Sequence, residues 1–266
     1  MSQLKDLLEK AGNLKNLFSL NGRKALVVGG NKGLGQAMAL ALAAAGADVA
    51  VAGRGPAGLA ETAEAVASLG RKGEYLAADA SDPNEVKRMF AAVNDRLGGL
   101  DILVNSQGTV HLQEAIDFDM EQWDRVMNVN LRSLVLTCKE AGRLMLAKGY
   151  GKIINISSVR SLQGRVNDLA YAPSKAAVNQ LTHSLAIEWG PKGINVNAIA
   201  PCFVRTEISA AYLDDPAKRA WVMSRIPMGC YSVPEDMFGA VVFLASDASR
   251  FINGHLLMID GGWTVA

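Results

Sequence analysis

The sequence of 266 residues predicts a single α/β domain, a doubly wound parallel sheet with helices on both faces. Short, fully apolar runs alternate with longer helical patterns from Arg23 to the end of the chain, and strands buried on both faces of a parallel sheet have this continuous apolar character. Strict alternation of strand and helix requires right-handed crossovers within one sheet. Half of the residues are hydrophobic and no linker or repeat interrupts the pattern, so the chain can bury one large core.

The apolar runs give the expected strands, at residues 25–28, 49–52, 74–78, 102–104, 153–156, 196–199 and 256–259. The helical patterns between them cover 33–45, 59–69, 83–97, 123–147, 176–189 and 234–245. Several of these patterns stop at a glycine, the residue that most often ends a helix. This order of elements predicts a Rossmann fold.

Three stretches lie outside this alternation. Residues 1–20 have leucines at helical spacing with charges of both signs between them, which predicts an amphipathic N-terminal extension that precedes a domain of residues 21–266. Residues 160–170 and 202–227 are expected to be irregular. Because both follow strand ends, where open α/β sheets bind ligands, they are candidate substrate-facing loops.

Composition and charge exclude several classes of function. With 27 basic and 26 acidic residues the net charge is +1, so nothing favours nonspecific binding to nucleic acid or to an anionic membrane. The N-terminus lacks the unbroken apolar segment of a signal peptide, and no apolar run is long enough to span a bilayer. The three cysteines and three histidines have no disulfide-framework or metal-site spacing, so no metal is expected. A cytoplasmic protein is the expectation.

A glycine-rich turn follows the first strand directly. Its sequence is Gly29-Gly30-Asn31-Lys32-Gly33-Leu34-Gly35, and a helical pattern begins within it. Glycines allow positive φ and bring backbone N–H groups close to a pyrophosphate at the helix N-terminus. No Gly-Lys-Ser/Thr follows, which excludes a P-loop. The turn therefore predicts a dinucleotide site; a tight turn without ligand is the alternative.

The end of the second strand indicates which dinucleotide is bound. An acidic residue there would hydrogen-bond the ribose 2′-hydroxyl of NAD, but the segment is Ala52-Gly53-Arg54 and no carboxylate occurs before Glu61. Arg54 would instead pair with a 2′-phosphate, and Lys32 can add charge from the glycine turn. For either cation taken singly, a solvated surface charge is the better interpretation. Their joint placement, with no acid nearby, makes NADP(H) the preferred cofactor and NAD(H) the alternative.

Tyr171 and Lys175 are four residues apart, so they share one face of a helix. A free tyrosine has a pKa of about 10, and a neighbouring ammonium favours the phenolate and lowers that value. The pair is therefore a plausible acid/base unit for a carbinol proton. Ser158, at the end of the fifth strand, is expected to hydrogen-bond the substrate oxygen and hold it against Tyr171.

From about Phe18 onward the chain resembles the short-chain dehydrogenases/reductases. The matching features are the spacing Gly29-x-x-x-Gly33-x-Gly35, Asp79 within Ala78-Asp79-Ala80-Ser81-Asp82, Asn130 within Asn128-Val129-Asn130-Leu131, and the set Ser158, Tyr171 and Lys175. The resemblance implies that Tyr171 is the acid/base, that Lys175 lowers its pKa and binds the nicotinamide ribose, and that Asn130 holds a water of a proton relay. It further implies cofactor contacts from the glycine turn and from Asp79, Ala80, Asn105, Gly108, Pro201, Val204 and Thr206.

Three positions depart from the family pattern. Val28 stands where a threonine usually precedes the first glycine, Gln107 replaces a typical alanine in Asn105-Ser106-Gln107-Gly108, and Cys202 replaces a common glycine after Pro201. None of these changes removes a catalytic group. They are expected to alter the shape around the cofactor and its affinity.

Segments at both ends of the chain resemble the gluconate 5-dehydrogenase branch, which implies a sugar acid or polyol as substrate. Arg160, Arg165 and Arg205 lie in loops after strand ends and are candidates to receive a carboxylate, and His111 is a candidate substrate contact. Solvated or ion-paired loop residues are the alternative for each. Trp263 and the last strand resemble the family's subunit contact region, which implies a homotetramer or homodimer. The rival functions are a 3-oxoacyl reductase and a nucleotide-binding protein without turnover.

Overall fold

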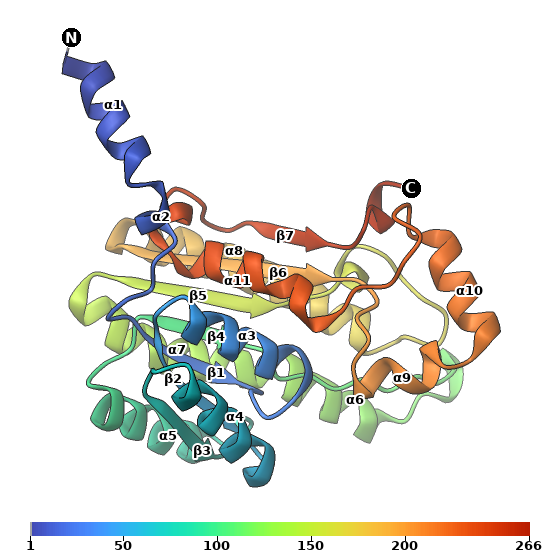
Figure 1. The fold of residues 1–266 in the computed structure, drawn as a ribbon. Helices are drawn as coiled ribbons and strands as arrows, with labels where there is room; N and C mark the ends of the chain where they lie inside the picture. Colours follow the sequence, from blue (N-terminus) through green and yellow to red (C-terminus); the bar gives the residue numbers. More distant parts are fainter. Residues whose placement is uncertain (1) are drawn as a thin grey trace.

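The computed structural model describes residues 2–266, and within them seven parallel strands form one sheet in the order β3-β2-β1-β4-β5-β6-β7 (Figure 1). The strands are β1 (Lys24–Val28), β2 (Asp48–Gly53), β3 (Gly73–Ala77), β4 (Ile102–Asn105), β5 (Gly151–Ile156), β6 (Ile194–Pro201) and β7 (Leu256–Ile259). The chain runs outward from β1 in one direction and then from β4 in the other. The predicted doubly wound sheet is confirmed, and its switch point lies between β1 and β4.

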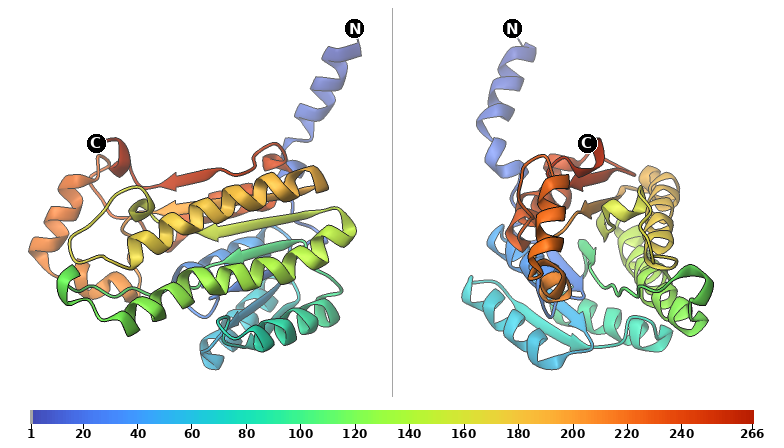
Figure 2. Two further views of the ribbon diagram at one scale, coloured as in Figure 1. Left: turned by 180° about the vertical axis from the view of Figure 1, so that it is seen from behind. Right: turned by 90° about the vertical axis from the view of Figure 1, so that its right-hand side faces the viewer.

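Helices cover both faces of the sheet (Figures 1 and 2). On one face α3 (Gly33–Ala44), α4 (Pro56–Ser68) and α11 (Phe238–Ala245) pack against strand residues such as Val27. On the other, α5 (Pro83–Leu97), α7 (Ser133–Lys148) and α8 (Tyr171–Trp189) pack against residues such as Leu26. Successive residues of a strand point to opposite faces, which is why the buried strands are mainly apolar along their whole length.

Two regions differ from the sequence-based expectation. Residues 202–227 are not irregular throughout, because they contain α9 (Glu207–Leu213) and α10 (Pro216–Arg225). Asp215 caps α10 by accepting from two backbone N–H groups, and a cluster around Trp263 buries Leu213 and Val222 beneath the pair. The long helix expected over 123–147 is divided into α6 (Met120–Met127), a π-helical turn (Asn128–Arg132) and α7.

The N-terminal residues form α1 (Ser2–Gly12) and the short α2 (Leu14–Leu17), and α1 projects away from the body of the domain (Figure 2). Leu4, Leu7 and Leu8 are exposed on α1. Phe18 lies against Phe243 of α11, with ring centroids 6.5 Å apart, and this contact joins the extension to the domain. Met1, part of the predicted extension, lies outside the described residues.

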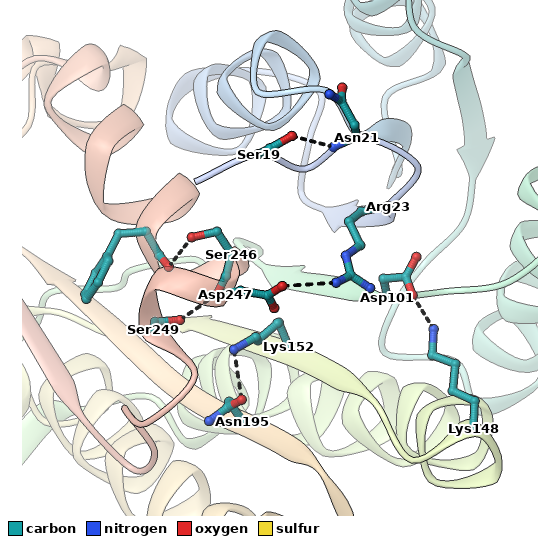
Figure 3. Close-up of polar contacts among 11 residues, drawn as sticks. Ser19, Asn21, Arg23, Asp101, Lys148, Lys152, Asn195, Ser246, Asp247 and Ser249 are labelled. Carbon is teal, nitrogen blue, oxygen red and sulfur yellow. Dashed lines mark hydrogen bonds and ion pairs between the residues drawn. The ribbon is translucent and has the colours of Figure 1, made fainter. Parts of the chain in front are cut away.

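A group of charged side chains lies at the amino-terminal edge of the sheet, where β1, β5 and β6 begin (Figure 3). Lys152 is 2% exposed and donates a hydrogen bond to Asn195 Oδ1 at 2.9 Å. Burial lowers the pKa of Lys152 to about 8, against the opposing influence of Asp247. Arg23 pairs with Asp247 at 3.5 Å, and Lys148 pairs with Asp101. These groups satisfy one another and link the starts of the strands to the turn after α11.

Within residues 2–266 none of the helices combines the length and the apolar character that crossing a membrane requires.

Candidate active site

Two adjoining cavities lie beyond the carboxyl ends of the strands, where the arrowheads in Figure 1 point toward α9. One, of about 390 Å³, lies against the glycine turn and the ends of β2 and β3. The other, of about 310 Å³, lies between the end of β5, the start of α8 and α9. The two cavities share their lining at Leu34, Ser106, Gln107, Gly108 and Thr206. A ligand that extends from one into the other would therefore place its two ends in different chemical surroundings.

The first cavity is shaped by the close approach of backbone to backbone at the glycine turn. Gly29 and Gly33 have φ values of 83° and 57°, in the left-handed region that favours glycine. A Cβ on Gly35 would meet Gly29 O at 2.0 Å, so no larger residue fits without moving the turn. The free N–H groups of the first turn of α3 border this cavity, as a pyrophosphate site requires.

The far end of the first cavity holds the charged residues that bear on cofactor choice. Arg54 is exposed and forms no ion pair with any described residue. The Ser81 hydroxyl, which donates to Asp79 at 2.7 Å, holds the pKa of Asp79 below its usual range, and the Arg54 charge contributes in the same direction. Lys32 differs from the expectation, because its Nζ already pairs with Glu207 Oε2 at 2.6 Å. Arg54 is thus the cation free to receive a 2′-phosphate.

Gln107, at the junction of the cavities, supplies a further test of cofactor fit. Its amide Nε2 donates to Ser133 Oγ at 3.0 Å, and the single Ser133 hydroxyl proton goes to Val129 O at 2.7 Å. Ser133 can therefore only accept, which orients the amide and leaves Gln107 Oε1 buried without a partner among the described residues. A dinucleotide carries ribose hydroxyls and a carboxamide that can donate to such an oxygen. The residues present fit a dinucleotide lying across both cavities.

The second cavity brings together Ser158, Tyr171 and Lys175. Ser158 follows β5, Tyr171 begins α8, and the next turn of α8 carries Lys175. Lys175 is 3% exposed and its Nζ donates to Ile156 O at 2.7 Å, which fixes it under the end of β5. Ser158 Oγ accepts from Arg160 N at 3.1 Å, and it lies near enough to Tyr171 to act on the pKa of the phenol. The arrangement presents one phenol and one hydroxyl to the same point in the cavity.

The pKa of Tyr171 does not follow the sequence-based expectation. Burial raises it above its ordinary value, and the groups that oppose this effect are Ser158, Arg165 and Arg160. Lys175 is not among them; its Nζ lies 5.8 Å from the centroid of the Tyr171 ring, and burial lowers the pKa of Lys175 to about 8. Burial therefore outweighs the groups that lower the pKa of Tyr171, and Lys175 is not among the causes of the shift in this geometry.

Two residues implied by the resemblance lie behind the cavities and line neither. Asn130, in the π-helical turn, accepts from Thr109 N at 2.7 Å and donates to Ser174 Oγ at 3.0 Å. Asn105 donates to Asn155 and accepts from Thr137, so it ties β4 to β5 and α7. Both side chains are fully buried. They position the backbone beneath the site, and Gly108 lies against both Asn130 Oδ1 and Lys175 Nζ.

The four candidate substrate residues divide into two groups. Arg160 and Arg165 line the second cavity, and each has a buried guanidinium nitrogen, Nη2 and Nε respectively, without a partner among the described residues. Arg205 pairs with Asp214 at 2.9 Å and lines neither cavity. His111 contacts Gln113 and the edge of the Phe118 ring, and it also lies outside both cavities. The structure therefore brings two of the four to the site.

The remaining predicted residues lie where the sequence analysis expected them. The first cavity is lined by Gly29, Asn31, Lys32, Gly33, Leu34, Gly35, Arg54, Asp79, Ala80 and Gly108, and the second by Pro201, Val204 and Thr206. Leu34, Gly108 and Thr206 border both cavities.

Comparison with known proteins agrees with this site. A family model described as enoyl-(acyl carrier protein) reductase matches residues 28–264. A 2-dehydro-3-deoxy-D-gluconate 5-dehydrogenase of Bacillus subtilis is 44% identical over 95% of this chain and 98% of its own length. The chain belongs to the short-chain dehydrogenase/reductase family. The predicted resemblance and the prediction of an enzyme are both confirmed.

Other members of the short-chain dehydrogenase/reductase family extend the comparison. A gluconate 5-dehydrogenase of Gluconobacter oxydans is 36% identical over 94% of this chain and 98% of its own length. The crystal structure of a gluconate 5-dehydrogenase from Burkholderia cenocepacia, in complex with NADP and tartrate, superposes with a TM-score of 0.92 at 35% identity. That alignment covers 95% of this chain and 99% of the neighbour.

Sequence analysis missed several residues that line the cavities of this short-chain dehydrogenase/reductase. Glu207, Ser209 and Tyr212 come from α9, in a stretch that was expected to be irregular. The signal that could have found them is Thr206, because a threonine before a helical segment is a preferred N-cap. Gln107 was noted only as a departure from the family pattern, although its extra length places an amide between the two cavities.

Proposed function

We propose that this protein transfers a hydride between NADP(H) and the secondary alcohol or ketone of a sugar acid, with carbon 5 as the reacting carbon. The observation that carries the proposal is that one cavity is lined by both the Ser158–Tyr171 pair and two arginines, each of which has a buried nitrogen that no described residue pairs with. The hydroxyl pair suits a carbonyl oxygen, and the arginines suit a carboxylate. The names of the relatives quoted above, which specify sugar acids and carbon 5, support the same substrate class.

The chain's own residues would perform the proton chemistry. When bound, the cofactor supplies the hydride to the carbonyl carbon or takes it from the carbinol carbon. Tyr171 gives its phenolic proton to the carbonyl oxygen in reduction and takes that proton back in oxidation. Ser158 hydrogen-bonds the same oxygen and holds it against Tyr171. The protonated phenol is the form that donates in ketone reduction, and burial raises the pKa of Tyr171 further in the direction of that form.

The carboxylate of the substrate would be bound by Arg160 and Arg165. Arg160 is 9% exposed, lies over the Trp263 ring with its Cζ 5.4 Å from the centroid, and donates only a long hydrogen bond to Gly164 O. Burial and the charge of Arg165 lower its pKa, so an anion between the two guanidinium groups would relieve both effects. Asp168 holds Arg165 at 2.9 Å and also caps α8, which fixes the second arginine relative to Tyr171.

The test is Arg160→Met, with Arg205→Met as the matched control because Arg205 is exposed and outside the cavities. Turnover is followed by the absorbance of reduced nicotinamide with 2-dehydro-3-deoxygluconate, gluconate and neutral secondary alcohols. We expect Arg160→Met to raise KM for the acids about 10-fold to 100-fold, the strength of a charge-assisted contact, and to leave neutral alcohols unchanged. Equal losses with acids and neutral alcohols would contradict the carboxylate site. Turnover of 3-oxoacyl substrates alone, or cofactor binding with no turnover, would favour one of the rival functions.

We also propose that the protein is a cytoplasmic homotetramer or homodimer, with residues 1–20 as an extension of the 21–266 domain. The outer edge of β7 is unpaired within the described chain and its residues are only partly buried, which supports a subunit contact there. Light scattering on the purified protein measures the assembly directly. A monomer at micromolar concentration would contradict this proposal.

A further inference from the structure

The ion pair between Lys32 and Glu207 spans the mouth of the first cavity. Lys32 belongs to the glycine turn before α3, and Glu207 is the first residue of α9, 175 positions later in the chain. Both side chains line the cavity, their charged atoms are 2.6 Å apart, and both are more than half exposed. This contact therefore joins the glycine turn to the start of α9 at the lining of the cavity.

The backbone on either side of Lys32 shows which part of the cavity this is. Asn31 lies against Gly53 and Gly55, which flank Arg54, with its side-chain atoms 3.5 and 3.3 Å from where their Cβ atoms would be. On the other side, the Thr206 side chain lies 3.6 Å from the Cβ position of Gly33. Lys32 thus stands between the turn that carries Arg54 and the start of α9, at the end of the cavity where a 2′-phosphate would lie.

The charges at this end nearly cancel. Arg54 and Lys32 are positive, and Asp79 and Glu207 are negative; all four line the cavity. Asp79 is held ionised by its hydrogen bonds to Ser81. With Lys32 committed to Glu207, only Arg54 is available to a phosphate that carries nearly two negative charges. The 2′-phosphate and the Glu207 carboxylate therefore compete for the same ammonium group.

We propose that Glu207 is a cofactor-selectivity residue, which weakens the preference for NADP(H) over NAD(H) by holding Lys32 away from the 2′-phosphate. NAD(H) has no phosphate there and leaves the Lys32–Glu207 pair intact, whereas NADP(H) must draw Lys32 from it. The inference depends on the NADP(H) part of the proposed function and is independent of the sugar acid.

The test measures dissociation constants of NADPH and NADH by fluorescence, without substrate, for the wild type and Glu207→Gln. The substitution keeps the side-chain shape and removes the charge. Because exposed ion pairs are weak, we expect NADPH to bind about threefold to fivefold more tightly and NADH to change by less than about twofold. Asp214→Asn is the matched control, since Asp214 pairs with Arg205 outside both cavities, and it should change neither constant.

A second variant separates competition for Lys32 from a general field effect. In a Lys32→Met background, Glu207 has no partner and its exposed side chain can turn into solvent, so Glu207→Gln should change the NADPH constant by less than about twofold. NADPH binding that is unchanged or weaker in the single variant Glu207→Gln would overturn the inference. The same gain in NADPH affinity when Glu207→Gln is added to Lys32→Met would also overturn it. Failure of the wild type to bind either dinucleotide would contradict the proposed function as well.

Discussion

Two buried lysines lie at opposite ends of the strand β5. They share a lowered pKa, but the groups that surround them differ. Lys152 lies at the amino-terminal edge and Lys175 at the carboxyl edge, and burial lowers the pKa of each to about 8. Lys152 is surrounded by paired charges and lines neither of the two cavities described above (Figure 3). Lys175 lines a cavity beside a phenol and a hydroxyl.

The difference teaches that a perturbed pKa does not by itself locate a reaction site. Burial acts on an ammonium group in the same way at both edges, since it disfavours the charged form wherever the group lies. What distinguishes the carboxyl edge is open volume, lined by the Tyr171 phenol, the Ser158 hydroxyl and the two arginines Arg160 and Arg165. At the amino edge the charges neutralise one another and connect the starts of the strands.

The largest expected effect separates the two edges by activity. Tyr171→Phe removes the proton-transfer group and should lower kcat about 1000-fold, with the NADPH dissociation constant within about threefold of wild type. Lys152→Met removes the buried amine at the amino-terminal edge and should leave kcat within about threefold of the wild-type value. Steady-state kinetics and fluorescence titration measure both quantities. A Tyr171→Phe enzyme with a tenth of wild-type activity would contradict the assigned chemistry. A folded but inactive Lys152→Met enzyme would show that the amino edge is also needed for activity.

An intermediate effect concerns one arginine at each edge of the sheet. Arg54 follows β2 at the carboxyl edge, and Arg23 precedes β1 at the amino edge. Arg54→Asp should shift the ratio of kcat/KM for NADP(H) over NAD(H) toward NAD(H) by about 10-fold to 100-fold, because it replaces a phosphate partner with a repelling charge. Arg23→Gln, at the amino edge, should leave this ratio unchanged, since Arg23 pairs with Asp247 and stacks over Tyr150. Kinetics with both dinucleotides give the ratio. The same ratio in Arg54→Asp and wild type would mean that Arg54 does not contact the phosphate.

The smallest effect is on stability and depends on pH. The pKa of Lys152 is about 8 in the folded chain and 10.5 when unperturbed, so between these values the unfolded chain binds more protons and stability rises with pH. Below pH 8 the folded protein carries the full cost of the buried ammonium. Relative to Lys152→Met, the wild type should therefore gain about 1–2 kcal/mol of unfolding free energy between pH 7.5 and 10, after allowance for Asp247 and residual solvation. Chemical denaturation at the two pH values measures it; parallel pH dependence in both proteins would contradict a lowered pKa.

Sequence alone determined the features that depend on local chemistry. Short, mainly apolar runs predicted all seven strands, because the inner strands of a parallel sheet are buried on both faces and are rich in apolar residues. The glycine turn was predictable because positive φ and backbone approach select glycine at Gly29, Gly33 and Gly35. The Tyr171–Lys175 pair followed from helical spacing, which fixes the relation of two side chains before any tertiary contact forms.

Only the tertiary structure decided the features that depend on distant partners. Arg160 and Arg205 have the same chemistry and similar positions after strand ends, yet Asp214 takes Arg205 while Arg160 is left facing the cavity. Packing around Trp263 converts a polar stretch into α9 and α10, and so brings Glu207 to Lys32. The direction of the Tyr171 pKa shift was also a matter of burial, which no spacing in the sequence records. Charge, burial and pairing are properties of neighbours in space, and those are set when the whole chain has folded.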